Sequence, residues 1–500
     1  MLTPFTGKMP PSWRAALALF ARAGVYLGAL FLLFLSYWIN RYFGKPDIEQ
    51  IPYHLNFGVD GLTTADPVLV HRFLRWCVLA PLAVLALLVV GERRLIARAV
   101  ALGAPRRLAG LLAGWMPPAL LAGALVHWAL QVSALQYLES GFGPDYFVSY
   151  YLAPEKVTLV ETHPKNLVLI YVESLEQSYT EGDVFGRDLL APLTRLEASH
   201  FESYEQVPGT GWTIAAMVAT QCGVPLKRVS VYDINAQGEK VRSFLPNATC
   251  LSDILAAHGY RNVFMGGAST TFAGKGKFLR THHYQEVYGK EEWLGQGVAA
   301  SDMNGWGLYD DDLFGKAKLK LRQLQASKQR FNLTLLTVDS HEPEGHLSRG
   351  CARRGYTGFD GVISCTAQDL AGFVRFAEDS GSLANTNIVI IGDHLARVNP
   401  LSDALAMVPR RTIFNRFISD LPPPKNREQL VHFDLLPTIL EFNGFTVPGG
   451  RLGLGYSGFY PHRARPPADR FEEMQASLMN RSETYLALWR PRPAPATPHS

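Results

Sequence analysis

Three long apolar runs dominate the first third of the chain. They lie at residues 23–39, 76–91 and 108–130. Each is close to the roughly 20 residues that a helix needs to cross a bilayer. Prolines interrupt the second and third runs, which a membrane helix tolerates when neighbouring groups satisfy the freed carbonyls. The first run is too long, and too weakly followed by a small-residue cleavage site, for a cleaved signal peptide. We therefore expect a membrane region of about three helices over residues 1–135.

Basic residues that flank these runs predict their orientation. Lys8 and Arg14 precede the first run. Five arginines lie between the second and third runs, namely Arg93, Arg94, Arg98, Arg106 and Arg107. Because positively charged loops stay in the cytosol, the N-terminus is predicted to be cytosolic. Three crossings then place everything after about Ser133 on the outer face of the membrane.

The pattern after the third run divides the rest of the chain into three parts. Residues 136–163 are rich in tyrosine, phenylalanine and proline, which indicates a juxtamembrane linker, either along the lipid surface or simply between domains. Residues 164–462 have a globular pattern. Residues 463–500 are expected to form a basic, proline-rich tail, with helical spacing over 470–488 and a disordered end, and we assign it no chemistry.

Four short apolar runs, each beginning at an asparagine, stand in the globular part. They lie at residues 166–172, 262–265, 332–338 and 387–391. Such continuous runs are typical of strands buried on both faces, as in a parallel sheet. Segments with helical periodicity, such as residues 250–258 and 369–380, lie between them. This alternation predicts an α/β fold, with an open sheet that carries helices on both faces.

Polar residues stand within three positions of the ends of three of these strands. Glu173 follows the first, His341 the third, and Asp393 with His394 the fourth. In open α/β sheets, ligands bind at the edge where the strands end. One polar residue there is usually an ordinary loop residue, but four of metal-binding types at one edge indicate a site. Two carboxylates and an imidazole suit Mn²⁺ or Zn²⁺, and they suit Mg²⁺ less well.

Residues 209–217 combine a glycine-rich turn, a hydroxyl residue and an apolar run with helical spacing. Backbone N–H groups and the dipole at such a helix start favour an anion such as a phosphate. Thr213 is the predicted nucleophile, although a threonine in this position is more often only a helix N-cap. If Thr213 completes the metal shell, the metal lowers the pKa of its hydroxyl, and the substrate is then a phosphate ester. Lys275 is expected to neutralise the transferring group, and His341 to protonate the leaving oxygen or hold the phosphate.

Charge and cysteine content narrow the function further. The formal net charge is only +4, so no basic field favours a nucleic acid as partner. Of five cysteines, Cys77 lies in an apolar run, and the others show neither CxxC nor zinc-finger spacing. Disulfides are permitted outside the cytosol. We expect the two sequence-local pairs, Cys222 with Cys250 and Cys351 with Cys365; four unrelated thiols are the alternative.

Several segments together resemble the lipoteichoic acid synthases and their relatives, which have the sulfatase fold. They are residues 166–174, 211–213, 340–343, 392–394 and 432–438. Four further segments more narrowly resemble the bacterial phosphoglycerol transferases of glucan modification. They are residues 208–215, 221–223, 272–275 and 451–457. The resemblance covers roughly residues 166–459.

The resemblance implies an alkaline-phosphatase/sulfatase-like fold, with a mixed sheet flanked by helices, on the periplasmic side of a bacterial inner membrane. It implies that Thr213 attacks the phosphorus of phosphatidylglycerol and that diacylglycerol leaves. The phosphoglyceryl group would then pass to an osmoregulated periplasmic glucan. One divalent metal ion is implied, with Mn most favoured and Zn or Mg possible. Its implied ligands are Glu173, Thr213, Asp393 and His394. Implied substrate contacts are Lys275, His341, Trp306 and His346.

The sequence bears on three other functions. A sulfatase needs a Cys/Ser-x-Pro-x-Arg turn for its formylglycine, and the turn at Thr213 lacks that pattern. A phosphoethanolamine transferase acting on lipid A or a glycan uses the same chemistry and remains an alternative. A non-catalytic, membrane-anchored glycan- or lipid-binding protein is a third possibility, against which the intact set of predicted site residues speaks.

Overall fold

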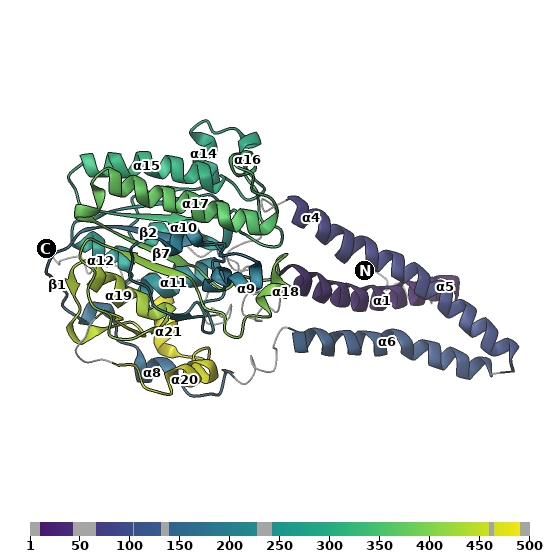
Figure 1. Cartoon of the computed structure of the whole chain (residues 1–500). Coiled ribbons are helices and arrows are strands. Elements are labelled where there is room, and N and C mark those ends of the chain that lie inside the picture. Colours follow the sequence, from purple (N-terminus) through teal and green to yellow (C-terminus); the bar gives the residue numbers. More distant parts are fainter. Residues whose placement is uncertain are drawn as a thin grey trace, which may run out of the picture. The chain divides into compact units, whose positions relative to one another are not determined.

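The computed structural model describes residues 11–43, 67–103, 105–131, 140–227, 243–459 and 465–490. These residues belong to two compact units (Figure 1). One unit lies within residues 1–48 and 67–137, and the other holds the described residues from 140 onward.

The first unit is helical throughout its described residues. It contains α1 (Pro11–Phe43), α4 (Pro67–Phe73), η1 (Leu74–Leu79), α5 (Ala80–Ala101) and α6 (Arg106–Gln131). Two stretches, Leu17–Tyr42 and Val70–Ala101, are long and apolar enough to cross a membrane, by length and composition. The third predicted run is also helical, as the 26-residue α6, and its crossing stays a prediction.

Polar contacts tie the helices of this unit together. Glu92 of α5 is buried, and it forms an ion pair with Arg22 of α1 and accepts a hydrogen bond from Tyr26 Oη at 3.3 Å. A buried carboxylate is costly unless it is paired, so these contacts fix α5 against α1. The helix that contains α4 and α5 passes through the π-turn η1 just before Pro81. Proline lacks an N–H group and its ring crowds the preceding turn, which is where helices adopt such irregular hydrogen bonding.

A six-stranded sheet forms the centre of the second unit, in the order β5-β4-β6-β2-β7-β8. The strands are β2 (Asn166–Val172), β4 (Arg261–Gly266), β5 (Glu286–Tyr288), β6 (Phe331–Leu336), β7 (Thr386–Gly392) and β8 (Asn415–Ile418). The four strands predicted from apolar runs are all present and mutually parallel. The two edge strands were not predicted, and β8 runs antiparallel to β7, so the sheet is mixed.

Helices cover both faces of this sheet (Figure 1). On one face lie α15 (Asp310–Ala326) and α17 (Gly358–Asp379), and on the other α11 (Thr213–Cys222), α12 (Leu251–Ala257) and α19 (Leu435–Phe442). Side chains of β2 alternate between two apolar cores, with Leu167, Leu169 and Tyr171 in one and Val168 and Ile170 in the other. Each fully buried side chain contributes about 1.5–3 kcal/mol, so the central strand is fixed from both sides.

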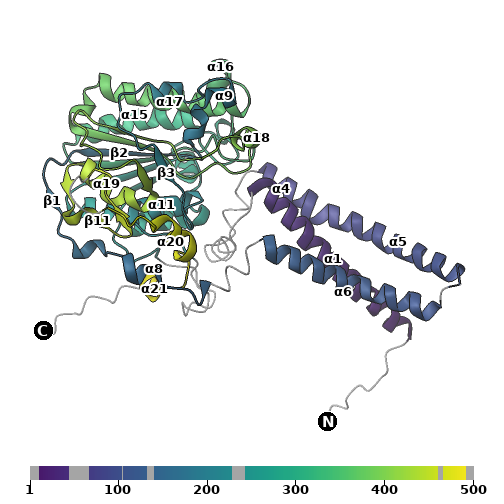
Figure 2. The ribbon, with the colours of Figure 1, turned by 60° about the horizontal axis from the view of Figure 1, so that its bottom comes forward.

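The helical spacing predicted over residues 470–488 of the C-terminal segment corresponds to helices within residues 465–490. These residues form α20 (Arg470–Ser477) and α21 (Glu483–Trp489), two helices instead of one, which pack on the globular unit beside α8 (Tyr146–Tyr150) (Figure 2). Tyr485 is 1% exposed, and its ring centroid lies 5.3 Å from that of Phe147. Met474 and Trp489 are buried in the core, so this segment folds onto the globular unit although its composition is basic. The disordered end predicted at 491–500 lies outside the described residues.

Candidate active site

Polar residues at the C-terminal edge of the sheet converge with the start of α11. Glu173 follows β2, Asp393 and His394 follow β7, and Thr213 is the first residue of α11. Thr213 Oγ1 donates a hydrogen bond to Glu173 Oε2 at 3.2 Å. His394 Nε2 lies 3.4 Å from Glu173 Oε1 and 3.5 Å from Asp393 Oδ2. The four predicted metal ligands therefore meet in one cluster.

Thr213 is not the N-cap of its helix. The N-cap position belongs to Trp212, which has extended backbone and makes no side-chain capping bond. The first hydrogen bond of the helix runs from the Ala216 N–H to the Trp212 carbonyl at 2.9 Å. The N–H groups of the first turn thus lack a capping side chain, and the Thr213 hydroxyl is directed to Glu173 instead. An uncapped helix start of this kind can bind an anion.

The cluster fits a divalent cation. Glu173, Asp393 and His394 each offer a ligand atom, and these atoms lie within 4.8 Å of one another. Asp393 Oδ1 accepts the backbone N–H groups of Ser174 and His394, both at 2.8 Å, but the buried Oδ2 has no hydrogen-bond donor among the described residues. His394 Nδ1 lies 2.9 Å from the Leu395 carbonyl, so a proton on Nδ1 leaves Nε2 free to bind a metal. Orphaned buried oxygens are rare without a ligand.

Because the cluster is buried, the pKa of each group depends on the charges of its neighbours. Burial, and then the charge of Glu173, raise the pKa of Asp393 to about 7. Burial alone would lower the pKa of His394, but the carboxylates of Asp393 and Glu173 outweigh it and raise that pKa. A bound cation would relieve this crowding of negative charge.

Lys275 is a buried cation in the field of the same carboxylates. It begins α13 (Lys275–Thr281), directly after a turn in which Ala273 adopts a φ of +54°. Lys275 is only 5% exposed to solvent. Burial lowers the pKa of Lys275 to about 8, while Glu173 and Asp393 act in the opposite direction. This position suits the neutralising role predicted for it.

His341 and Trp306 lie together beside the cluster. Their ring centroids are 4.3 Å apart, and the Phe272 ring centroid lies 5.4 Å from that of Trp306. A ring nitrogen of His341 and a carboxylate oxygen of Glu173 lie within 4.8 Å of each other. His346 is in the same loop, where its backbone N–H donates to the Asp339 carbonyl at 2.7 Å. The substrate roles of Trp306 and His346 stay predictions.

A second layer of polar residues escaped the sequence reasoning. Ser174 Oγ lies between two carboxylates, 2.8 Å from Glu173 Oε1 and 2.9 Å from Glu342 Oε1, and its one proton is shared between them. Glu342 Oε1 also accepts the Arg397 N–H at 2.6 Å, and the Arg397 guanidinium donates to the Gly211 carbonyl at 2.8 Å. These bonds join the carboxylate cluster to the turn that precedes Thr213. Ser174 and Glu342 lie in two segments that carry the family resemblance, 166–174 and 340–343, and Arg397 stands three positions after His394. These are the signals that could have found them.

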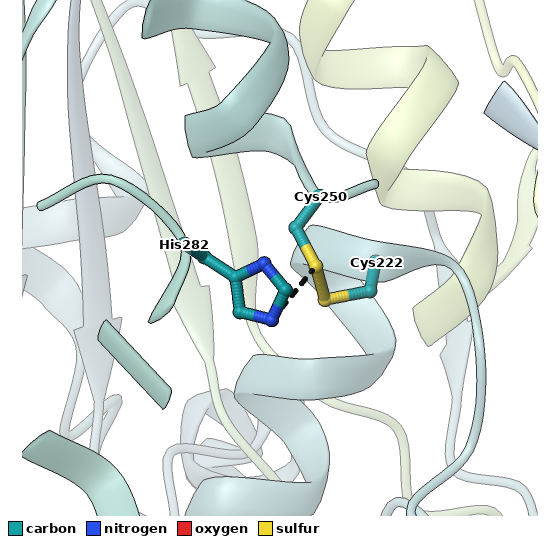
Figure 3. Close-up of side chains that lie close together, drawn as sticks. All are labelled: Cys222, Cys250 and His282. Atoms are coloured by element: carbon teal, nitrogen blue, oxygen red, sulfur yellow. Dashed lines mark hydrogen bonds between the residues drawn. A yellow bond between two sulfur atoms is a disulfide. The ribbon is translucent and has the colours of Figure 1, made fainter. Parts of the chain in front are cut away.

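Both predicted disulfides are present, and one anchors the helix that carries Thr213. Cys222, the last residue of α11, is bonded to Cys250, and Cys351 is bonded to Cys365. The His282 ring lies beside the first disulfide, with Nε2 3.7 Å from Cys250 Sγ (Figure 3). This trio has metal-binding residue types, but the two sulfurs are bonded to each other and offer no thiolate.

Comparison with known proteins agrees with this architecture. The Sulfatase family model matches residues 165–445, more than half of the chain. A phosphoglycerol transferase I from Citrobacter koseri is 40% identical over 301 residues, which cover 58% of this chain and 38% of the relative. One from an Escherichia coli strain is 39% identical over 302 residues, with the same coverage. The matched segment thus spans under two fifths of these relatives.

Among solved structures, a protein in the alkaline phosphatase superfamily from Vibrio parahaemolyticus aligns with a TM-score of 0.45 and 20% identity. The alignment covers 64% of this chain and 75% of that one. The family match and the mixed, helix-flanked sheet confirm the predicted fold class. The chain belongs to the sulfatase family.

Proposed function

We propose that this protein is an enzyme that transfers phosphoglycerol from phosphatidylglycerol to a periplasmic glucan, through a covalent bond to Thr213. The observation that carries the proposal is the hydroxyl of Thr213, half-buried at an uncapped helix start and hydrogen-bonded to Glu173. The relatives named phosphoglycerol transferase I support phosphoglycerol as the transferred group, and phosphatidylglycerol as its donor is part of the proposal.

The residues of the site divide the chemistry of the first half-reaction among them. Glu173 orients the Thr213 hydroxyl and accepts its proton as Oγ1 bonds to phosphorus, and the first-turn N–H groups of α11 bind phosphoryl oxygens. Lys275 offsets the charge that develops on those oxygens, and His341 donates a proton to the departing diacylglycerol oxygen. Diacylglycerol leaves, and the phosphoglyceryl group stays on Thr213.

The metal ion in this proposal is Mn²⁺, with Zn²⁺ and Mg²⁺ as less favoured alternatives. Glu173, Thr213, Asp393 and His394 would hold it, and when bound it would lower the pKa of the Thr213 hydroxyl and draw phosphoryl oxygens towards it. Two carboxylates, a hydroxyl and an imidazole form a mixed oxygen and nitrogen set, which suits a borderline divalent ion. Replacing Asp393 by Asn is expected to reduce bound metal, measured by mass spectrometry of the purified protein.

The location in this proposal is the inner membrane, with the globular unit in the periplasm. Three crossings, the third by α6, would carry the chain from a cytosolic N-terminus to that side. Two disulfides in the globular unit support the oxidising compartment, since such bonds do not persist in the cytosol. The membrane unit would keep the enzyme beside its lipid donor.

The test uses the full chain in detergent micelles with phosphatidylglycerol labelled in its glycerol headgroup, with and without Mn²⁺. We expect diacylglycerol release, and label on the peptide that contains Thr213. Thr213→Ala should lower the release by roughly a thousand-fold or more, as removal of a catalytic nucleophile does. Thr213→Ser, which keeps a hydroxyl, is the matched control and should retain part of the activity. Undiminished release by Thr213→Ala would disprove the proposal.

A further inference from the structure

A cavity of about 530 Å³ lies beside the nucleophile turn. Such a volume is within the range of ligand-binding clefts in proteins. Its lining comes from the segments around β9 (Gln429–Val431), the loop after His394, and the segment that leads into α20. The lining residues that matter here are Gln206, Leu395, Arg410, Gln429, Arg470 and Phe471.

This cavity shares a wall with the active site. Gln206 lines it, and the Gln206 Oε1 atom accepts the backbone N–H of Leu395 at 2.8 Å, one residue after His394. The amide nitrogen of Gln206 also lies against Gly211, where an added Cβ would meet it at 3.0 Å. Gly211 stands two residues before Thr213. A ligand in the cavity is therefore separated from the nucleophile turn by one layer of side chains.

The arginines of the lining each face a carboxylate, and Glu472 adds a further, exposed carboxylate. Arg410 forms an ion pair with Glu205, and Arg470 forms one with Asp434 at 2.9 Å. Arg411 is paired with Glu176 in the same way. Because each of these arginines already faces a carboxylate, the lining offers no surplus positive charge to a phosphate or a lipid headgroup. What remains for a ligand is amide groups, the Glu472 carboxylate, paired charged groups that can still hydrogen-bond, and one aromatic ring.

This combination fits a polyhydroxylated, uncharged ligand. Gln429 is exposed on β9, and its side-chain amide already donates to Glu205 Oε1 at 3.2 Å, which leaves its oxygen and a second N–H for other partners. Phe471 is half-buried at the start of α20, so one part of its ring remains accessible to an apolar surface. Binding pockets of this kind join a few polar groups, which fix orientation, to apolar area.

We infer that this cavity is an acceptor subsite, which binds an uncharged sugar segment of the glucan and thereby holds a neighbouring sugar of the same glucan chain, with its hydroxyl, near the group on Thr213. The inference rests on the proposed function. In the second half-reaction the sugar oxygen bonds to phosphorus, and the bond from phosphorus to Thr213 Oγ1 breaks. The hydroxyl proton passes, in sum, to the Thr213 oxygen, so the threonine is regenerated.

The experiment compares Gln429→Ala and Phe471→Ala with Gln325→Ala. Gln325 lines a separate cavity of about 360 Å³, among residues at the opposite, N-terminal edge of the sheet, so it is the matched control. The full chain in micelles is assayed with labelled phosphatidylglycerol and a short, neutral β-glucan oligosaccharide. We expect the KM for the oligosaccharide to rise roughly five- to ten-fold in each cavity variant, the effect of one or two lost contacts. The KM for the lipid donor should not change.

Binding measured by calorimetry separates this inference from the proposed function. The oligosaccharide should bind the wild type and Gln325→Ala, and bind the cavity variants more weakly, even if no diacylglycerol is released. Glycerol phosphate is added to the oligosaccharide as a charged competitor. If it displaces the oligosaccharide from the wild type, the assignment of the cavity to an uncharged sugar is overturned. Equal oligosaccharide affinity in Gln429→Ala, which replaces an exposed side chain and should fold, would also overturn it.

Discussion

At the scale of single residues, the active site depends on backbone geometry as much as on functional groups. Gly392 ends β7 directly before Asp393, and an added Cβ there would collide with the carbonyl oxygen of Leu175. Ser174, which follows Glu173, adopts a φ of +53°, a conformation that non-glycine residues rarely take. Strain of this kind persists where the surrounding structure imposes it, and it is common at functional sites. The positions of both carboxylates thus follow from a close approach of the loops after β2 and β7.

Gly392→Ala should therefore disrupt the site. The added methyl group forces the two loops apart, and we expect a loss of about 2–4 kcal/mol in the free energy of unfolding, with loss of bound metal. The matched control is Gly315→Ala on α15, where nothing lies within 4 Å of the added Cβ. It should stabilise the protein by about 0.5–1 kcal/mol, since alanine is the better helix former. Thermal unfolding and metal analysis check both; equal stability of the two variants would contradict the account.

Glu441 gives the globular unit a pH-dependent stability. It is half-buried in α19, where it accepts hydrogen bonds from Ser457 Oγ at 2.7 Å and from the Val447 N–H at 3.3 Å. Burial raises the pKa of Glu441 to about 7. In the unfolded chain the pKa is near 4.3, so between these values the folded state holds a proton that the unfolded state has released. Stability from this group is full below pH 4 and is lost as the pH rises to about 7.

Glu441→Gln should remove that dependence. After a discount for solvent screening, we expect the variant to be about 1–2 kcal/mol more stable than the wild type at pH 8 and nearly equal to it at pH 5. Unfolding temperatures at the two pH values test this. Glu202→Gln changes an exposed carboxyl group and should leave the pH dependence unchanged. An unchanged slope in Glu441→Gln would count against the burial effect.

At the scale of elements, the sequence predicted what depends on long apolar runs and missed what depends on packing. β2, β4, β6 and β7 were visible because strands buried on both faces need continuous apolar residues. The edge strands β5 and β8 have three and four residues, too few for a periodic signal. The convergence of Thr213 on Glu173 followed from sheet topology and a glycine-rich turn. The bond from Arg397 to Gly211 joins positions 186 residues apart, which no local pattern reveals.

The disulfide at the end of α11 is expected to support catalysis as well as stability. The pair spans 28 positions between Cys222 and Cys250, and in the chain-entropy model removing it costs about 3–4 kcal/mol. The Cys351–Cys365 pair spans 14 positions and should cost about 3 kcal/mol. Since only the first fixes the helix that carries Thr213, its double alanine variant should lose more diacylglycerol release at a temperature where both variants remain folded. Equal losses would show that the effect is one of stability alone.

At the scale of the whole molecule, the number of membrane crossings decides which side the globular unit occupies. Two crossings return the chain to the side of its N-terminus, and three place it opposite. Two stretches have the length and composition of a membrane span. Whether α6 also crosses therefore decides whether the number of crossings is two or three. Two disulfides in the globular unit favour the odd number.

Reporter fusions test this parity in cells. A reporter phosphatase that is active only when its own disulfides form should be active when joined after Arg490. The same reporter joined in the turn at Gly103, between α5 and α6, should be inactive. Activity at Gly103 together with inactivity after Arg490 would reverse the proposed orientation. Fusion levels measured by immunoblotting serve as the control for expression.

The packing of α21 against α8 has a consequence for biosynthesis. The ring of Phe147 in α8 packs against the ring of Tyr485 in α21. α8 is synthesised early in the globular unit, and it therefore lacks this packing partner until translation has passed residue 490. A domain closed in this way completes its core only after synthesis of its final helix, although its catalytic groups emerge long before. A chain truncated near position 465 would keep every residue of the carboxylate cluster, but it would expose the apolar surface that α20 and α21 cover, and we expect it to be less stable than the full chain.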